Sequence, residues 1–336
     1  MTPLQVTASP HLAGQDTTRQ IMWAVVWSLV PVVAASVYAF GPSAVLVLTA
    51  SVAGAVLTER VFGKQGSLLD GTALITGLLL GLCLPAGLPM WMAALGAAAG
   101  VGLGKFVFGG LGQNVFNPAL LGRAFLQAAF PVAMTTWPIR TGVSWWSLKG
   151  DNLAWPLMSA APDAITGATP LGLLKFEHTH TPVIELLLGQ ASGSAGEVGG
   201  VLILLGGGYL ALRNCLNWRI PASIFLSVAA LAFVFHWIDA VRYPSVPFAL
   251  FSGGLMLGAV YMATDPVTAP ITNRGRWIFG IGIGVLVVLI RNWGGLPEGV
   301  VYAILIMNAL VPFINRATQP RIFGTGLTDV DRRVAQ

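Results

Sequence analysis

Charged residues are scarce in this chain of 336 residues: Asp, Glu, Lys and Arg make up 9% of it, and hydrophobic residues make up 55%. An ordinary soluble domain is about 25% charged, so the composition excludes a soluble globular protein. Several apolar runs reach the roughly 20 residues that a helix needs to cross a bilayer. They predict an all-α integral membrane protein, surrounded by lipid. The formal net charge of +5 is attributed to basic cytoplasmic loops, and no nucleic acid is expected as a partner.

Cysteine is nearly absent, and the common nucleotide-binding motifs are missing. Cys83 and Cys215 are too few to hold an iron–sulfur cluster, which usually takes four thiolates, unless partner subunits supply the others. There is no P-loop, no dinucleotide fingerprint and no Cys-x-x-Cys pair. His178 and His180 stand in a polar loop, where such side chains are usually solvated, and no metal site is expected. The chain should bind neither NAD nor ferredoxin by itself.

A cleavable signal peptide is also not expected, because the first 20 residues are polar and the apolar run after them is long enough to span. Glycine, in contrast, is abundant, with 41 residues. Small residues allow transmembrane helices to approach closely. The glycine content therefore agrees with a bundle of membrane helices.

The apolar runs predict about ten transmembrane helices, five on each side of a long polar connection. They are expected at residues 21–40, 44–62, 72–85, 88–108 and 118–130, and at 198–212, 220–238, 246–263, 277–290 and 299–314. The chain then divides into a cytoplasmic N-terminal segment, a five-helix repeat, an extracytoplasmic loop, a second five-helix repeat and a cytoplasmic tail. Their expected bounds are residues 1–20, 21–130, 131–196, 197–315 and 316–336.

An odd number of spans in each half means that the two halves, if related, are inverted in the membrane. Segments broken by glycine, proline or polar residues at comparable positions are the sequence mark of inverted repeats around a midplane site. Residues 70–72 and 114–119 in the first half, and residues 264–266 in the second, fit this description. We therefore expect two inverted five-helix repeats with broken helices.

The distribution of Lys and Arg predicts the orientation. With ten spans and both termini in the cytoplasm, most of the basic residues, Lys105 included, fall on the cytoplasmic side. The opposite side holds Arg140, Lys149, Lys175, Arg242 and Arg291. This bias follows the positive-inside rule. It places the long connection on the outer face of the cytoplasmic (inner) membrane, which is the periplasmic face in a Gram-negative cell.

The long connection contains the string Asp163-Ala164-Ile165-Thr166-Gly167-Ala168-Thr169-Pro170. Its small residues are expected to leave the hydroxyl of Thr169 unobstructed, and Gly167 permits backbone angles that other residues resist. Pro170 favours an extended conformation at Thr169, so the hydroxyl is expected to stand away from any helix. The string is similar to the acceptor sequence for covalent flavin attachment. An Asx-type turn followed by an X-Pro boundary is the alternative interpretation.

Over nearly its whole length, the chain resembles the D subunits of the Rnf complexes, which are ion-translocating ferredoxin:NAD oxidoreductases. The resemblance rests on this string, on residues 109–122 and 261–270, and on the ten-span plan. It implies that Thr169 carries FMN through a phosphoester. A separate flavin transferase would attach the FMN after recognising Asp163, Thr166, Gly167 and Ala168.

The resemblance also implies a second, non-covalent flavin, riboflavin, within the membrane part. Its site is placed at the asparagine-rich break, at Asn114 and Asn117. The other subunits of the complex are the implied partners. Because a flavin passes electrons and can link their transfer to proton uptake, this polypeptide would relay electrons between ferredoxin and NAD. No Ser/His/Asp or Cys/His arrangement for catalysis is present.

Ionisable residues within the spans are candidates for the ion pathway, because a buried charge in a membrane is costly and usually functional. Asp70 and Asp265 stand beside the broken segments and are the first candidates. Either acid can instead cap the N-terminus of a helix, a common function of Asp. Arg123 falls inside the fifth span, where pairing with an acid across the bundle is favoured over contact with a flavin.

Two other functions remain open from the sequence. Inverted repeats with broken helices also build solute channels and transporters. The chain is similar, in addition, to the B subunit of the sodium-pumping NADH:quinone reductase, which shares the flavin. The short polar segment before the first span favours the Rnf type.

Overall fold

The computed structural model describes residues 17–63, 67–138, 145–156, 158, 167–177, 179, 181–187, 189, 192–240 and 242–320. Every regular element in these ranges is helical. Asp163, Thr166, His178 and His180 lie outside the described residues.

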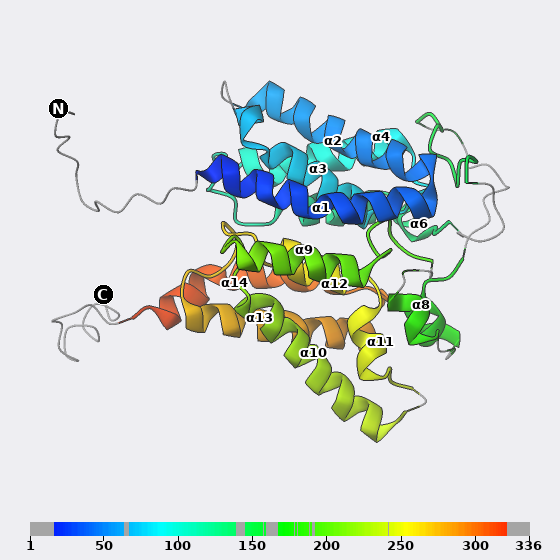
Figure 1. The fold of residues 1–336 in the computed structure, drawn as a ribbon, viewed down its shortest axis with the longest axis vertical. Helices are drawn as coiled ribbons and strands as arrows, with labels where there is room; N and C mark the ends of the chain where they lie inside the picture. The colour runs from blue at the N-terminus through cyan, green and yellow to red at the C-terminus, as the bar shows by residue number, and fades with distance from the viewer. Residues whose placement is uncertain are drawn as a thin grey trace.

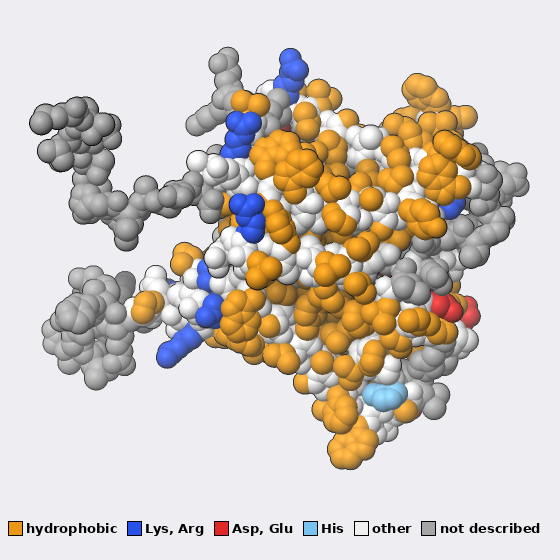
Figure 2. All heavy atoms as spheres, viewed as in Figure 1, with side chains coloured by type: hydrophobic (Ala, Val, Ile, Leu, Met, Phe, Trp, Pro, Cys, Tyr) orange, Lys and Arg blue, Asp and Glu red, His pale blue; other side chains and the backbone are white. Residues whose placement is uncertain are grey.

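Five helices are long and apolar enough to cross a membrane: α1 (Thr18–Phe40), α2 (Pro42–Phe62), α10 (Arg219–Ile238), α13 (Asn273–Trp293) and α14 (Val300–Thr318). Three shorter apolar helices accompany them: α3 (Thr72–Cys83), α4 (Met90–Val101) with its continuation η2 (Gly102–Phe106), and α9 (Gly200–Leu212). Hydrophobic side chains cover much of the flank shown in Figure 2. The predicted class of α-helical membrane protein is confirmed.

Some helix starts carry side-chain caps that the sequence signals. Helix α5 (Pro118–Ala129) begins where predicted, because the Asn117 side chain accepts hydrogen bonds from the backbone N–H groups of Ala119 and Leu120, with Pro118 in the first turn. Helix α1 begins at Thr18, before the predicted start, because Thr17 and Gln20 form a capping box.

One predicted span is wrong as a continuous helix. Residues 246–263 fold as α11 (Val246–Phe251), α12 (Leu255–Leu257) and the π-helix η4 (Gly258–Met262). The break lies within the span, where Gly253 has a φ of +65°, a left-handed conformation that glycine adopts without steric cost. A Cβ atom on Gly253 would lie 2.7 Å from a methyl carbon of Leu171. The break therefore leaves room for Leu171, a residue of the long connection, to pack against the helix bundle.

The remaining elements are short: η1 (Ser67–Asp70), α6 (Pro131–Thr135), α7 (Pro170–Gly172), η3 (Leu173–Glu177) and α8 (Val183–Leu187). In Figure 1, α1 to α4 form one layer, and α9 to α14 form another beneath it. Helix α1 begins and α14 ends at the same end of the molecule. Most of the Lys and Arg side chains visible in Figure 2 gather at that end.

The two layers have similar internal packing. Helix α2 packs against α3 and α4, and α10 packs against α11 and α13. A short sequence also recurs: the string Gly77-Leu78-Leu79-Leu80-Gly81, with Pro89 after it, matches Gly254-Leu255-Met256-Leu257-Gly258 with Pro266 after it. The spacing is the same in both copies, and each copy belongs to the third apolar segment of its layer.

Candidate functional site

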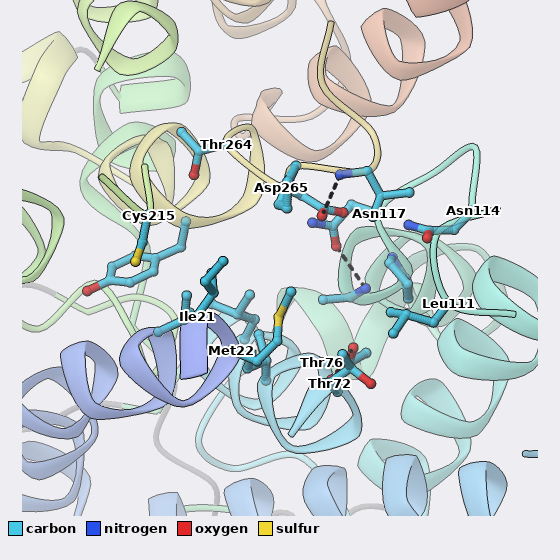
Figure 3. Close-up of a pocket in the computed structure, with 18 of the residues that line it drawn as sticks. Ile21, Met22, Thr72, Thr76, Leu111, Asn114, Asn117, Cys215, Thr264 and Asp265 are labelled. Carbon is cyan, nitrogen blue, oxygen red and sulfur yellow. Dashed lines mark hydrogen bonds between the residues drawn. The ribbon is translucent and has the colours of Figure 1, made fainter. Parts of the chain in front are cut away.

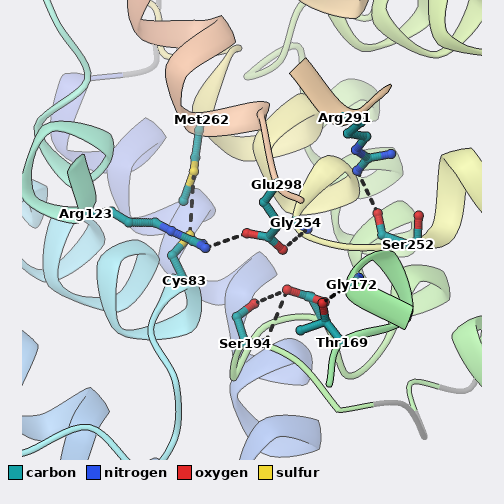
Figure 4. A network of polar contacts seen from close by, with 11 residues as sticks. Cys83, Arg123, Thr169, Gly172, Ser194, Ser252, Gly254, Met262, Arg291 and Glu298 are labelled. Atoms are coloured by element: carbon teal, nitrogen blue, oxygen red, sulfur yellow. Dashed lines mark hydrogen bonds and ion pairs between the residues drawn. The ribbon is translucent and has the colours of Figure 1, made fainter. Parts of the chain in front are cut away.

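Thr169 lies at the start of α7, and its backbone is extended as predicted, with φ −72° and ψ 155°. Its Oγ1 accepts a hydrogen bond of 3.1 Å from the backbone N–H of Gly172 (Figure 4). Thr169 is 5% exposed. The expectations that this hydroxyl is unobstructed and stands away from any helix are therefore wrong. Pro170 favours the first turn of a helix as well as an extended residue before it, and Thr169 consequently becomes the cap of that helix.

Thr169 lines an open cavity between the long connection and the bundle, with about 500 Å³ of empty space when the solvent at its mouth is included. Arg123 and Gln127 of α5 line the same cavity, together with Trp137 and Tyr302. The carbonyl of Trp137 accepts a hydrogen bond of 2.9 Å from the N–H of Gly167, which fixes residues 167–170 against this wall, while Ala168 is exposed. The cavity thus combines a guanidinium, an amide and two aromatic rings beside the threonine.

Arg123 forms an ion pair with Glu298, the residue that precedes α14 by two positions. Its Nη2 donates to Glu298 Oε2 at 2.5 Å, and Glu298 Oε1 accepts from the N–H of Gly254 at 3.3 Å. Arg123 is 6% exposed. The predicted pairing of Arg123 across the bundle is confirmed, because Arg123 lies on α5, which packs against α3 and α4, whereas Glu298 lies just before α14 in the other layer. Figure 4 shows the pair between Cys83 and Thr169.

Lys175 holds the Thr169 segment against the loop that carries Glu298. Its ammonium group donates to the carbonyl oxygens of Gly294 and Leu296. Partial burial lowers the pKa of Lys175 below its ordinary value. This contact joins η3 to the loop before α14, so Thr169 and Glu298 face one cavity.

A second cavity, of about 880 Å³ with its open mouth, lies where the layers meet near the end of the molecule at which α1 begins. Asn114, Asn117 and Asp265 line one side of it, and Thr72 lines the other (Figure 3). Lys105 also lines the cavity and donates a hydrogen bond to the hydroxyl of Thr72. The structure thus brings together residues of all three broken segments, which are far apart in the sequence. Asn117 Nδ2 donates to the carbonyl oxygen of Met262 at 3.1 Å, which joins the two layers.

The two acidic candidates for the ion pathway have different surroundings in the structure. Asp70 Oδ1 accepts from the backbone N–H and the hydroxyl of Thr72, at 2.9 and 2.7 Å, at the start of α3, which agrees with the capping interpretation. Asp265 caps no helix. Its carboxylate accepts from the N–H of Val267 and the hydroxyl of Thr268, both at 3.2 Å, and it faces the second cavity.

Sequence reasoning missed the ion pair between Lys105 and Glu59. Lys105 was expected among the cytoplasmic basic residues, but it is buried, and its Nζ lies 2.6 Å from Glu59 Oε1 and 2.8 Å from the hydroxyl of Thr72. The sequence did contain a signal for this pair, because Glu59 lies inside the predicted span 44–62 and Lys105 inside the predicted span 88–108. Charges at membrane depth usually pair with one another.

Within the part of the chain that the structure describes, no group of three or more His, Cys, Asp or Glu residues could hold a metal ion. The polar groups gather instead around the two cavities.

Comparison with known proteins identifies the family. A model of the NQR2, RnfD, RnfE family matches residues 5–324. The chain belongs to this family. It is 39% identical over 335 residues to the D subunit of the proton-translocating ferredoxin:NAD(+) oxidoreductase complex of Clostridium ljungdahlii, with 95% of this chain and 96% of that protein covered.

Two further relatives are D subunits of ion-translocating oxidoreductase complexes. The protein of Stutzerimonas stutzeri is 43% identical over 331 residues, with 92% of this chain and 93% of that protein covered. The protein of Halorhodospira halophila is 36% identical over 341 residues, with 95% of each covered. These similarities extend over the layers, both cavities and the long connection.

Proposed function

We propose that this chain is the D subunit of an ion-translocating ferredoxin:NAD oxidoreductase complex of the Rnf type, and that it carries FMN covalently on Thr169. The single observation that carries the proposal is Thr169 itself, placed at the end of the acceptor-like string and on the wall of a cavity with Arg123, Trp137 and Tyr302. Full-length similarity to the D subunits of such complexes supports it. The other subunits would supply the sites for ferredoxin and NAD.

The residues around Thr169 fit a flavin nucleotide. Arg123 offers a cationic donor and Gln127 an amide, and aromatic rings such as those of Trp137 and Tyr302 commonly pack against flat cofactors. When bound, FMN supplies one- and two-electron chemistry that no side chain of the chain provides. A phosphoester at Thr169 would prevent its loss by dissociation. A flavin transferase would make this bond during maturation, and the fold of the loop would have to give it access, because the hydroxyl is buried in the present structure.

The second cavity is proposed as the riboflavin site. Asn114 and Asn117 line it with Thr72 and Lys105, and these residues offer both donors and acceptors to a flat polar ring. Its lining is also largely apolar, as in most cofactor sites. The proposal follows from the resemblance, and the geometry adds that residues from both layers would touch the same ligand.

For the architecture, we propose ten spans in two inverted five-helix repeats. They occupy residues 21–130 and 197–315, with the segment 131–196 between them and short segments at 1–20 and 316–336. The recurrence of the string at Gly77 and Gly254 supports the repeat, as does the similar packing of α2 and α10. The cluster of basic residues where α1 begins and α14 ends supports cytoplasmic termini in the inner membrane. The Thr169 segment would then be periplasmic.

Mass spectrometry of the peptide that contains Thr169 tests the proposed function. In protein isolated from its native membrane, this peptide should carry the mass of FMN less water, and release of the phosphoester should return the unmodified peptide. A fully unmodified peptide would contradict the assignment and favour the solute channel. An FMN peptide in a complex that reduces quinone instead of ferredoxin would favour the sodium-pumping quinone reductase.

Asp265→Asn is expected to lower ion transport by about tenfold or more, the effect of losing about 1.4 kcal/mol, while flavin content stays near that of the wild type. Asp265 faces the second cavity at the junction of the layers, where a charge is costly and usually functional. Ion uptake by vesicles containing the complete complex would be compared with flavin fluorescence. Asp70→Asn is the matched control, since Asp70 only accepts from Thr72. Normal ion transport in Asp265→Asn would remove Asp265 from the pathway.

A further inference from the structure

Helices α10 and α13 pack closely at Gly280 and Gly284 and separate farther along. A Cβ atom on Gly280 would collide with the hydroxyl of Ser223, and one on Gly284 with the hydroxyl of Ser227. One turn later α13 carries Val288 instead of a small residue. In Figure 1, α10 diverges from the bundle toward its C-terminal end. The separation leaves room for a cavity that the proposed function does not use.

This third cavity has about 1490 Å³ of empty space when the solvent at its mouth is included. Val228, Ala232 and Phe235 of α10 line it, together with Val288 of α13. Because the α10 residues recur at helical spacing, they share one face of the helix. They extend along it for roughly 10 Å, at about 1.5 Å per residue. One wall of the cavity is therefore an apolar groove that runs along α10.

The end of the third cavity nearest the long connection is basic. Lys175, Arg242 and Arg291 line it, and none of its described lining residues is acidic. The carboxylate of Asp239 is close by, where it accepts from the backbone N–H of Arg242 at 3.1 Å. The ion pairs found within the described part of the chain involve none of the three basic residues. Positive charge is thus in excess at this end.

The basic residues retain unused hydrogen-bond donors. The ammonium group of Lys175 has three N–H donors, of which two bond to backbone carbonyls of the loop before α14. Arg291 is buried, and its terminal nitrogens donate to backbone carbonyls at 2.6 and 2.8 Å, while its Nε has no acceptor among the described residues. Glu298, which acts electrostatically on Arg291, is itself bound by Arg123. A phosphate group, with several acceptor oxygens, suits such a set of cationic donors.

Exposed aromatic residues mark the level of the basic end in the membrane. Trp237, near the end of α10, is 84% exposed, and Trp293, the last residue of α13, is 53% exposed. Trp side chains concentrate at the boundary between hydrocarbon and headgroups. The exposed Arg242, just beyond α10, then lies at headgroup level, and Val228 lies within the hydrocarbon. A soluble anion would use only the basic end, whereas a phospholipid would use both ends.

We propose that the third cavity binds one anionic phospholipid, with its phosphate beside the three basic side chains and an acyl chain along the apolar groove of α10. A zwitterionic lipid would bring its ammonium group close to these cations, which disfavours it. Leu171 and Leu174, which follow Thr169, line the same cavity. The bound lipid therefore packs against the segment that holds Thr169. Binding requires no flavin.

Native mass spectrometry of the full-length protein in detergent tests the proposal, with phosphatidylglycerol and phosphatidylethanolamine of the same acyl chains as probes. The wild type should bind phosphatidylglycerol more tightly, and Arg242→Met should lower that affinity by about tenfold, as expected for the loss of a charged hydrogen-bond partner. Because Arg242 is exposed, its replacement should leave the lipid-free fold nearly unchanged. The matched control is Arg60→Met, which removes the same charge from an exposed position in the last turn of α2 and should keep the wild-type affinity.

Three results would overturn the proposal. The first is equal binding of the two lipids, or an equal loss of affinity in Arg242→Met and Arg60→Met. The second is displacement of the lipid by glycerol phosphate, which has the anionic group without acyl chains and would assign the cavity to a soluble phosphate. The third concerns Thr169→Val, which should bind the lipid as the flavin-bearing wild type does. Binding by this variant alone would assign the cavity to the flavin.

Discussion

Thr169→Val is expected to abolish covalent flavin attachment altogether. Valine keeps the branched shape of threonine but has no oxygen to form the phosphoester. The N–H of Gly172 loses its acceptor, and loss of such a helix cap costs about 1 kcal/mol, which is small enough for the fold to persist. The protein, coexpressed with a flavin transferase, would be separated on a denaturing gel and viewed under ultraviolet light. The wild-type band should fluoresce and the variant band should not.

Thr135→Val is the control for this experiment. Thr135 lines the same cavity, and its hydroxyl donates only to backbone carbonyls of its own short helix. This variant should keep full fluorescence. Fluorescence that survives in Thr169→Val, or that vanishes equally in Thr135→Val, would contradict attachment at Thr169.

Arg123→Met is expected to destabilise the protein strongly. It leaves the carboxylate of Glu298 without its cation in a largely buried position, and breaking a buried pair in this way typically costs about 3–5 kcal/mol. Thermal unfolding of the protein in detergent, followed by circular dichroism, should show a marked decrease in Tm. Removing both charges in Arg123→Met/Glu298→Gln should restore part of that loss, because no uncompensated charge remains.

An exposed basic residue provides the comparison. Arg242 lies outside the ion pairs described for the chain, and Arg242→Met should change stability by about 0.5 kcal/mol or less. A decrease in Tm for Arg242→Met as large as that for Arg123→Met would show that the ion pair is not the cause. Equal Tm values for the single and double variants at Arg123 would lead to the same conclusion.

Much of the fold follows from local sequence. Helix starts such as Asn117-Pro118 carry their own capping groups, and the apolar runs are long enough to show where most helices lie. The break at Gly253 was missed because an apolar run gives no sign of a glycine that adopts a left-handed conformation. Leu171 and Glu298, from distant parts of the chain, also occupy the space that a Cβ atom at this position would need.

The candidate site was predictable as a set of residues but not as an arrangement. The string before Pro170 identifies Thr169, yet the position of its segment depends on Lys175, which donates to the carbonyl oxygens of Gly294 and Leu296, and no local pattern describes these contacts. Likewise, the broken segments at Asn114 and Asp265 were each visible in the sequence. Their meeting in one cavity depends on how the two layers dock.

The contact between the layers determines whether the chain can be divided. Arg123 to Glu298, Asn117 to the carbonyl of Met262, and Tyr261 to the carbonyl of Ser28 all cross it. Lipid cannot replace these partners, since hydrocarbon offers no hydrogen bonds. Either layer synthesised alone would leave such groups unsatisfied within the bilayer. The polypeptide therefore assembles as one unit. If its gene were divided between the layers, the two fragments would insert stably only when both were present.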